Sequence, residues 1–150
     1  MLQVSVGQSN GFMTRVFYAE GRLIERETVR VPRDLNTDVL IEFTDKALKS
    51  VLKYLDTVTH PYTTDSVLNL EVGRKVVARY LNERHCNSIY EEELVELLKT
   101  FNRLPVSVEV VYNKETGFLI ADRYNKEKYV TEVQERTSAV SWFDEEDSHL

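Results

Sequence analysis

The twenty residues Phe12–Val31, FMTRVFYAEGRLIERETVRV, carry the strongest fold signal in the chain. Both halves are rich in aromatic and β-branched residues, which favour strands. Gly21 stands between the halves and can take the positive φ that a tight reversal needs. Pro32 follows and has no N–H group for a strand ladder. The stretch predicts a β-hairpin with strands Phe12–Ala19 and Arg22–Val31.

A short alternating stretch, Leu2–Val6, precedes this hairpin and predicts a further strand. The two are joined by Gly7-Gln8-Ser9-Asn10-Gly11, a dense turn signal. Backbone N–H groups of such a turn can approach a phosphate, but no helix is expected to follow it. We therefore interpret the turn as a hairpin loop. The first third of the chain predicts an antiparallel β-meander.

The middle of the chain is helical in pattern. Apolar residues in Val39–Val58 recur with a 3.6-residue period, which predicts a helix. Two starts are open: Asn36 caps the helix, or Val39–Phe43 is a strand and Thr44 is the cap. The dipeptide His60-Pro61 ends the helix in either case.

Two shorter helices are expected after it. Arg74–Arg84 has one apolar face, although a start nearer Ser66 is also open. The sequence Ser88-Ile89-Tyr90-Glu91 has the form of a capping box and starts the third helix. Pro105 prevents that helix from continuing.

The last third returns to strand patterns. Apolar and polar residues alternate from Val106 to Tyr112, and Asn113–Gly117 resembles a turn closed by a glycine bulge. Phe118–Tyr124 and Tyr129–Arg136 are then expected as strands. The expected fold is a single α+β domain over residues 1–136: an N-terminal antiparallel meander, three central helices and C-terminal antiparallel strands. Residues 137–150 form an aromatic and acidic tail.

Composition limits the classes of function. The 150 residues contain 19 Lys and Arg against 25 Asp and Glu, a net charge of −6, which disfavours binding nucleic acid over the whole surface. A local basic patch is compatible with that balance. The single cysteine, Cys86, excludes an internal disulfide and indicates a reducing compartment. No secretion signal or bilayer-spanning stretch is visible. These features predict a cytoplasmic protein that does not contact membranes.

No residue pattern argues strongly for catalysis. His60 lies between Asp56 and Asp65 and could act as a general base, but loops that end helices commonly contain such residues. Neither His60 nor Cys86 has a second ligand at metal-binding spacing. We therefore predict no cofactor and no metal, and an enzyme is not favoured.

Alternate positions of one expected strand carry Arg22, Arg26 and Arg30, which would place them on one face. The aromatic residues Phe12, Phe17 and Tyr18 could provide stacking surfaces for bases, and Arg15 and Arg33 are near in sequence. This pattern predicts a site for nucleic acid or a small phosphorylated ligand. Interleaved glutamates favour an ordinary solvated face instead.

A second basic cluster lies in the expected middle helix and comprises Arg74, Lys75, Arg79 and Arg84. A helix-turn-helix reader is rejected, because the next helix begins with three glutamates that phosphates would repel.

The tail contains Trp142 and Phe143, followed by Asp144, Glu145, Glu146 and Asp147. An aromatic pair beside acids suits a basic-rimmed hydrophobic pocket on another protein, or else it packs on its own sheet. The leading hypothesis is a non-enzymatic protein-interaction module: a small acidic adaptor, assembly subunit or inhibitor, of the kind found among phage accessory proteins. It would bind another protein or a second copy of itself. The alternative is a nucleic-acid or phosphate binder that uses the arginine-lined face.

Overall fold

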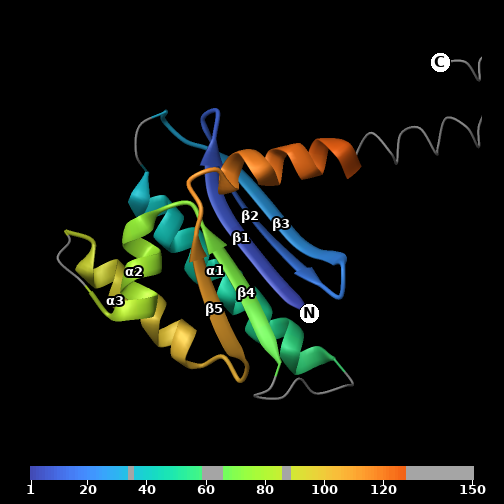
Figure 1. Ribbon diagram of the computed structural model, residues 1–150, viewed down its shortest axis with the longest axis vertical. Helices are drawn as coiled ribbons and strands as arrows, with labels where there is room; N and C mark the ends of the chain where they lie inside the picture. The colour runs from blue at the N-terminus through green and yellow to red at the C-terminus, as the bar shows by residue number, and fades with distance from the viewer. Residues whose placement is uncertain (34–35, 59–65, 86–88, 128–150) are drawn as a thin grey trace, which may run out of the picture. The chain divides into compact units, whose positions relative to one another are not determined.

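Five strands form one mixed sheet in the order β3-β2-β1-β4-β5 (Figure 1). Strands β1 (Leu2–Ser9), β2 (Phe12–Ala19) and β3 (Arg22–Arg30) form an antiparallel meander. Strand β4 (Val67–Val72) lies parallel to β1, and β5 (Ser107–Tyr112) lies parallel to β4. This computed structural model describes residues 1–33, 36–58, 66–85 and 89–127.

Three helices connect the strands: α1 (Thr37–Thr57), α2 (Lys75–Glu83) and α3 (Glu91–Asn102). Helix α1 contacts β1 and β2, α2 contacts β4 and β5, and α3 packs on α1. Alternate residues of β1 and β4 are fully buried beneath these helices and form the main core. None of the described helices is long and apolar enough to cross a bilayer.

The chain divides into a first unit, residues 1–120, and a second unit, residues 121–150. A last helix begins at residue 116 in the first unit and is described as far as residue 127. Within the second unit, Arg123 pairs with Glu127 at 3.0 Å and Lys126 pairs with Asp122 at 3.1 Å. Both pairs are one helical turn apart, which supports an exposed helix.

The predicted α+β class, the N-terminal meander and the three central helices are confirmed. Of the two starts considered for the first helix, the one at Asn36 is right, because helical geometry begins at Thr37. The Asn36 side chain does not cap the helix: its Nδ2 donates to the carbonyl of Pro32 at 2.7 Å instead. That bond holds the segment after β3 close to the helix start.

The prediction of a return strand at Phe118–Tyr124 is wrong, because residues 116–127 are helical. The Asn113 carbonyl accepts bonds from the Thr116 N–H at 3.1 Å and from the Thr116 hydroxyl at 2.6 Å. The Asn113 side chain accepts the Glu115 N–H at 3.0 Å. These hydrogen bonds satisfy backbone N–H groups at the start of a helix, so the same groups are not available to pair in a hairpin.

Two further consequences follow for the C-terminal strands. Strand β5 finds its partner in Val67–Val72, a strand that the sequence pattern did not single out, and the pair is parallel. The predicted strand Tyr129–Arg136 and the predicted domain boundary after it lie outside the described residues.

The start of the last helix rests directly on the backbone of β1. A Cβ added to Gly7 would lie 2.8 Å from the Cα of Gly117, and one added to Gly117 would lie 2.6 Å from the backbone nitrogen of Gln8. Real Cβ atoms do not approach other atoms so closely, and backbone cannot swing aside as a flexible side chain can. Glycine is therefore required at both positions.

We expect Gly7→Ala and Gly117→Ala each to lower the free energy of unfolding by about 3 kcal/mol or more, because overpacking against backbone admits little relaxation. Urea denaturation of the full chain measures this. Gly73→Ala is the matched control, since its Cβ would meet Gly7 at an easier 3.4 Å. Equal losses for all three variants would contradict the packing argument.

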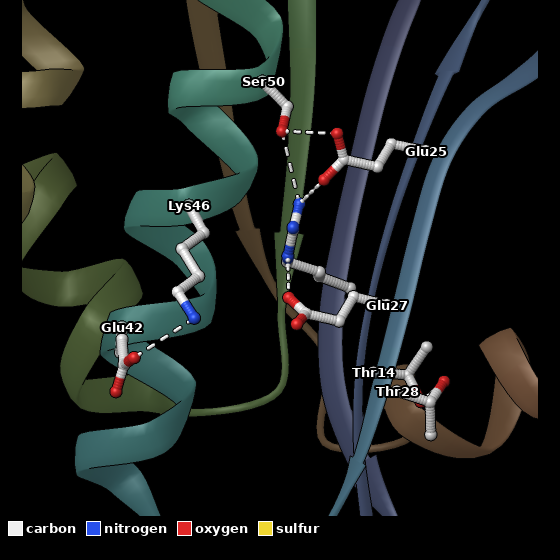
Figure 2. Close-up of polar contacts among 8 residues, drawn as sticks. Thr14, Glu25, Glu27, Thr28, Glu42, Lys46 and Ser50 are labelled. Atoms are coloured by element: carbon white, nitrogen blue, oxygen red, sulfur yellow. Dashed lines mark hydrogen bonds and ion pairs between the residues drawn. The ribbon is translucent and has the colours of Figure 1, made fainter.

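Arg15, whose side chain is largely buried, joins β2 to β3 and α1. Figure 2 shows two of its partners, Glu25 and Ser50, hydrogen-bonded to each other. The Arg15 side chain is 11% exposed and forms ion pairs with Glu25 and, at 2.8 Å, with Glu27. Its Nη1 also donates to the Ser50 hydroxyl at 3.3 Å, and that hydroxyl donates to Glu25 at 2.9 Å. The guanidinium lies 5.9 Å from the centre of the Phe43 ring. The edge strand β3 is thereby held to the helix layer.

Arg15→Ala should lower the free energy of unfolding by about 1–3 kcal/mol. Breaking a fully buried pair costs about 3–5 kcal/mol, and the loss is smaller here because both glutamates are about one-third exposed. Arg79→Ala, which removes an exposed pair with Glu83, should cost less than about 0.5 kcal/mol. Thermal or urea unfolding compares the two. A loss at Arg15 no larger than that at Arg79 would show that the cluster does not anchor β3.

Candidate functional site: the cationic end of the sheet

A cavity of about 450 Å³ opens at the carboxyl end of β1. Its lining residues are Gln8, Ser9, Asn10, Gly11, Arg33 and Arg74. They come from the β1–β2 turn, the segment after β3 and the start of α2. In open sheets with parallel strands, ligands commonly bind outside the carboxyl ends of the strands.

The turn takes its shape from two residues with positive φ, Asn10 at 50° and Gly11 at 80°. This is the geometry of a two-residue hairpin turn, and it sets Ser9 opposite Phe12. The Gly11 carbonyl accepts the Val31 N–H at 2.8 Å, so the end of β3 is fixed beside the turn.

Gln8 organises the wall of the cavity. Its Nε2 donates to the Pro32 carbonyl at 3.1 Å, and its Oε1 accepts from Asn36 Nδ2 at 3.3 Å. The same Oε1 lies 3.5 Å from Nη2 of Arg74. A single amide therefore ties together the segment after β3, the start of α1 and the start of α2.

The two arginines of the cavity lack carboxylate partners in the part of the chain that the structure describes. Neither Arg33 nor Arg74 forms an ion pair with any residue that the structure describes. The Nε atom of Arg74 is buried and has no hydrogen-bond partner within the same residues. A buried donor without a partner is costly, by about 1–3 kcal/mol. Arg74 also occupies the N-cap position of α2, where the helix dipole is positive.

A row of residues extends this site across the sheet. Ser9 pairs with Phe12, and Phe12 pairs with Arg30 on the next strand. The Arg30 guanidinium lies 5.6 Å from the centre of the Phe12 ring, and that ring is 41% exposed. Because Ser9 also lines the cavity, an exposed aromatic ring and a third arginine adjoin it.

These arginines differ from other cations of the fold. Arg79 pairs with Glu83, Lys99 with Glu96, and Arg15 with two carboxylates. By contrast, Arg30 and Arg33 have no carboxylate partner in the described part of the chain. The end of the sheet therefore carries local positive charge in an acidic protein.

The prediction that the β3 arginines share one face holds for Arg26 and Arg30 and is wrong for Arg22. An extra residue, Ile24, interrupts the pairing of β3 with β2. Such a bulge shifts the alternation by one position, so the residues beyond it point the other way. Arg22 pairs with Ala19 of the main core, on the opposite face from Arg26.

Two of the aromatic residues proposed for stacking are buried. Phe17 is 1% exposed and packs edge-on against Tyr54, with ring centres 5.4 Å apart. Tyr18 is 7% exposed and packs with Val16 and Ile120. Neither ring is available to a base, because each faces a core. Phe12 is the aromatic residue of this set that remains open.

The tail residues Trp142, Phe143, Asp144, Glu145, Glu146 and Asp147 lie outside the described residues. His60, Asp65 and Cys86 do so as well.

The site does not fit a metal ion. Oxygen ligands such as carboxylates are what hold divalent metal ions such as Mg²⁺ and Ca²⁺ in proteins. Here Gly7, Gly73 and Gly117 converge where β1 and β4 end, and they leave no room for added side chains at Gly7 and Gly117. In the described ranges no three His, Cys, Asp or Glu residues gather as a metal would require.

An acidic groove of about 340 Å³ lies elsewhere, lined by Asp38, Ile41, Glu42, Asp45, Glu93 and Glu96. Asp45 already accepts a bond from Thr100 and pairs with Lys49 at 2.8 Å. The hydrogen bond between Lys49 and Asp45, together with the negative charge of Asp45, raises the pKa of Lys49 above its ordinary value. We assign the groove no ligand.

No protein-family model and no curated protein matches the chain. Solved structures do match in fold. The N-terminal RNase H domain of a Mycobacterium tuberculosis protein has a TM-score of 0.56 at 9% identity, covering 75% of this chain and 86% of that one. The fold is similar to that of ribonuclease H1. RNase H1 of the halophilic archaeon Halobacterium salinarum gives 0.52 at 8% identity, over 75% and 83% of the two chains. LC11-RNase H1, solved in complex with an RNA/DNA hybrid, gives 0.52 at 11% identity, over 77% and 86%.

This likeness corrects the leading functional hypothesis. The interpretation as a non-enzymatic protein adaptor, assembly subunit, inhibitor or phage accessory protein is wrong, because these ribonuclease H1 structures share the fold. The alternative, a nucleic-acid binder, agrees better with that fold. Sequence reasoning had noted the turn at Gly7–Gly11 and the basic residue Arg74 separately and had set both aside. The turn and Arg74 are far apart in the sequence, and no local sequence pattern indicates that they lie close together in the fold.

Proposed function

We propose that this chain binds nucleic acid through the cationic end of its sheet. The observation that carries the proposal is a cavity lined by Arg33 and Arg74, with Arg30 on the adjoining end of β3, where none of the three has a carboxylate partner among the described residues. Arg74 is far in sequence from Arg30 and Arg33, so neither helix periodicity nor strand alternation explains why they lie together.

Guanidinium groups suit phosphate, because their planar forks donate paired hydrogen bonds to its oxygens. The net charge of −6 repels a nucleic-acid backbone from the remaining surface and confines contact to the positive end. Arg26 lies on the same sheet face as Arg30, with Thr28 between them on that face, and would extend the contact.

The comparison with solved structures supports the same conclusion. LC11-RNase H1, which shares this fold, was solved with an RNA/DNA hybrid bound. The proposal concerns binding. We derive no metal-dependent cleavage step, because the described residues do not fit a metal centre at this site.

Fluorescence anisotropy of a labelled 20-nucleotide oligomer with the full chain, from 50 to 200 mM salt, tests the proposal. Three phosphate contacts should give a slope of log K against log salt of about −2 to −3, at about −0.7 to −0.9 per contact. The triple variant Arg30→Gln, Arg33→Gln, Arg74→Gln should bind at least about tenfold more weakly and lose most of that slope.

The matched control removes three positive charges elsewhere: Lys46→Gln, Arg79→Gln and Lys99→Gln. These side chains are exposed and already paired, so their loss should change affinity less than about threefold. If no oligomer binds at 50 mM salt, or if the control loses as much affinity as the site variant, the proposal fails.

A further inference from the structure

We infer that the site takes a single strand of nucleic acid, with one unpaired base against Phe12 and the adjoining phosphate held in the cavity by Arg33 and Arg74. This inference rests on the proposed function and names its substrate class. It concerns a feature shared by DNA and RNA, a base with a free face beside a phosphate.

The first step is the exposure of Phe12. Phe12, at the start of β2, is 41% exposed and gains little from the core, in contrast to Phe17, which is 1% exposed on the opposite face of the same strand. Arg30 lies over the ring and adds a second flat surface to it. Base stacking on aromatic side chains and on arginine is a common mode of single-strand binding.

The second step is the distance between ring and cavity. Ser9 lines the cavity and is the direct cross-strand partner of Phe12. Cross-strand partners have Cα atoms only about 4.5–5.5 Å apart. A base on Phe12 and its own phosphate in the cavity are therefore within the reach of one nucleotide.

The third step is the state of Arg74. Among the described residues its side chain makes one long contact, 3.5 Å from Nη2 to Gln8 Oε1, and its buried Nε has no partner. A phosphate offers several acceptor oxygens and would satisfy a guanidinium that the fold leaves under-bonded. A cavity of about 450 Å³ is within the usual range for small-ligand sites and accommodates a phosphate with its sugar.

A duplex meets these features poorly. Its bases are stacked on one another, so an aromatic side chain reaches a base face only where a base is unpaired or flipped out. The geometry at Phe12 therefore favours a single strand over a paired one.

The experiment compares three ligands of one sequence in the anisotropy assay: single-stranded DNA, single-stranded RNA and the blunt RNA/DNA hybrid. Both single strands should bind at least about tenfold more tightly than the hybrid. Phe12→Leu should weaken single-strand binding by about 5- to 100-fold, and Phe12→Trp should retain it, because only the ring supports stacking. Thermal melts establish that the variants fold.

Arg74 is tested by its conservative replacement. Arg74→Lys keeps the charge but removes the planar fork, so affinity should fall at least about threefold while the salt slope stays unchanged. Arg79→Lys is the matched control and should have no effect.

The outcomes separate the two proposals. If the hybrid binds as tightly as the single strands, or if Phe12→Leu has no effect on them, the single-strand inference is overturned while the arginine-dependent binding stands. If no ligand binds, the proposed function fails and the inference with it.

Discussion

The contact between the backbones at Gly7 and Gly117 is the constraint on which the arrangement of this end of the sheet depends. It lets the start of a helix lie against the carboxyl end of β1, at a separation that admits no side chain on either glycine. Gly73 closes the same region from β4. Asn113 accepts hydrogen bonds from Glu115 and Thr116 that fix where the helix begins, so the end of β5 is brought to the same place.

This packing explains the chemistry of the site. Because the backbones at positions 7 and 117 are in close contact, neither position can carry a carboxylate side chain. The polar groups at this end of the sheet come instead from the neighbouring turn and from Arg74. A sheet end with arginines and an exposed aromatic ring suits phosphates and bases. The similarity to ribonuclease H1 structures is thus a similarity of fold, while the site must be argued from its own residues.

Arg15 and Arg74 are both arginines with buried side-chain atoms, but they differ in how many hydrogen-bond and ion-pair partners the fold gives them. Arg15 bonds to Glu25, Glu27 and Ser50 and holds the edge strand to α1. Within the described part of the chain, the Arg74 side chain makes only a long contact to Gln8. The first arginine completes its bonding within the fold, and the second is left able to bond a ligand.

The sequence by itself determined the elements whose signals are local. The hairpin at Phe12–Val31, the helical period over Val39–Val58 and the exposed position of Arg30 follow from alternation, periodicity and turn residues, although the sequence left the start of that helix open. Only the tertiary structure decided that 116–127 is a helix, that β4 lies beside β1, and that the bulge at Ile24 turns Arg22 away. It also decided that Gln8, Arg33 and Arg74 meet. Pairings between distant segments depend on which partner each strand finds, and no nearby residue encodes that choice.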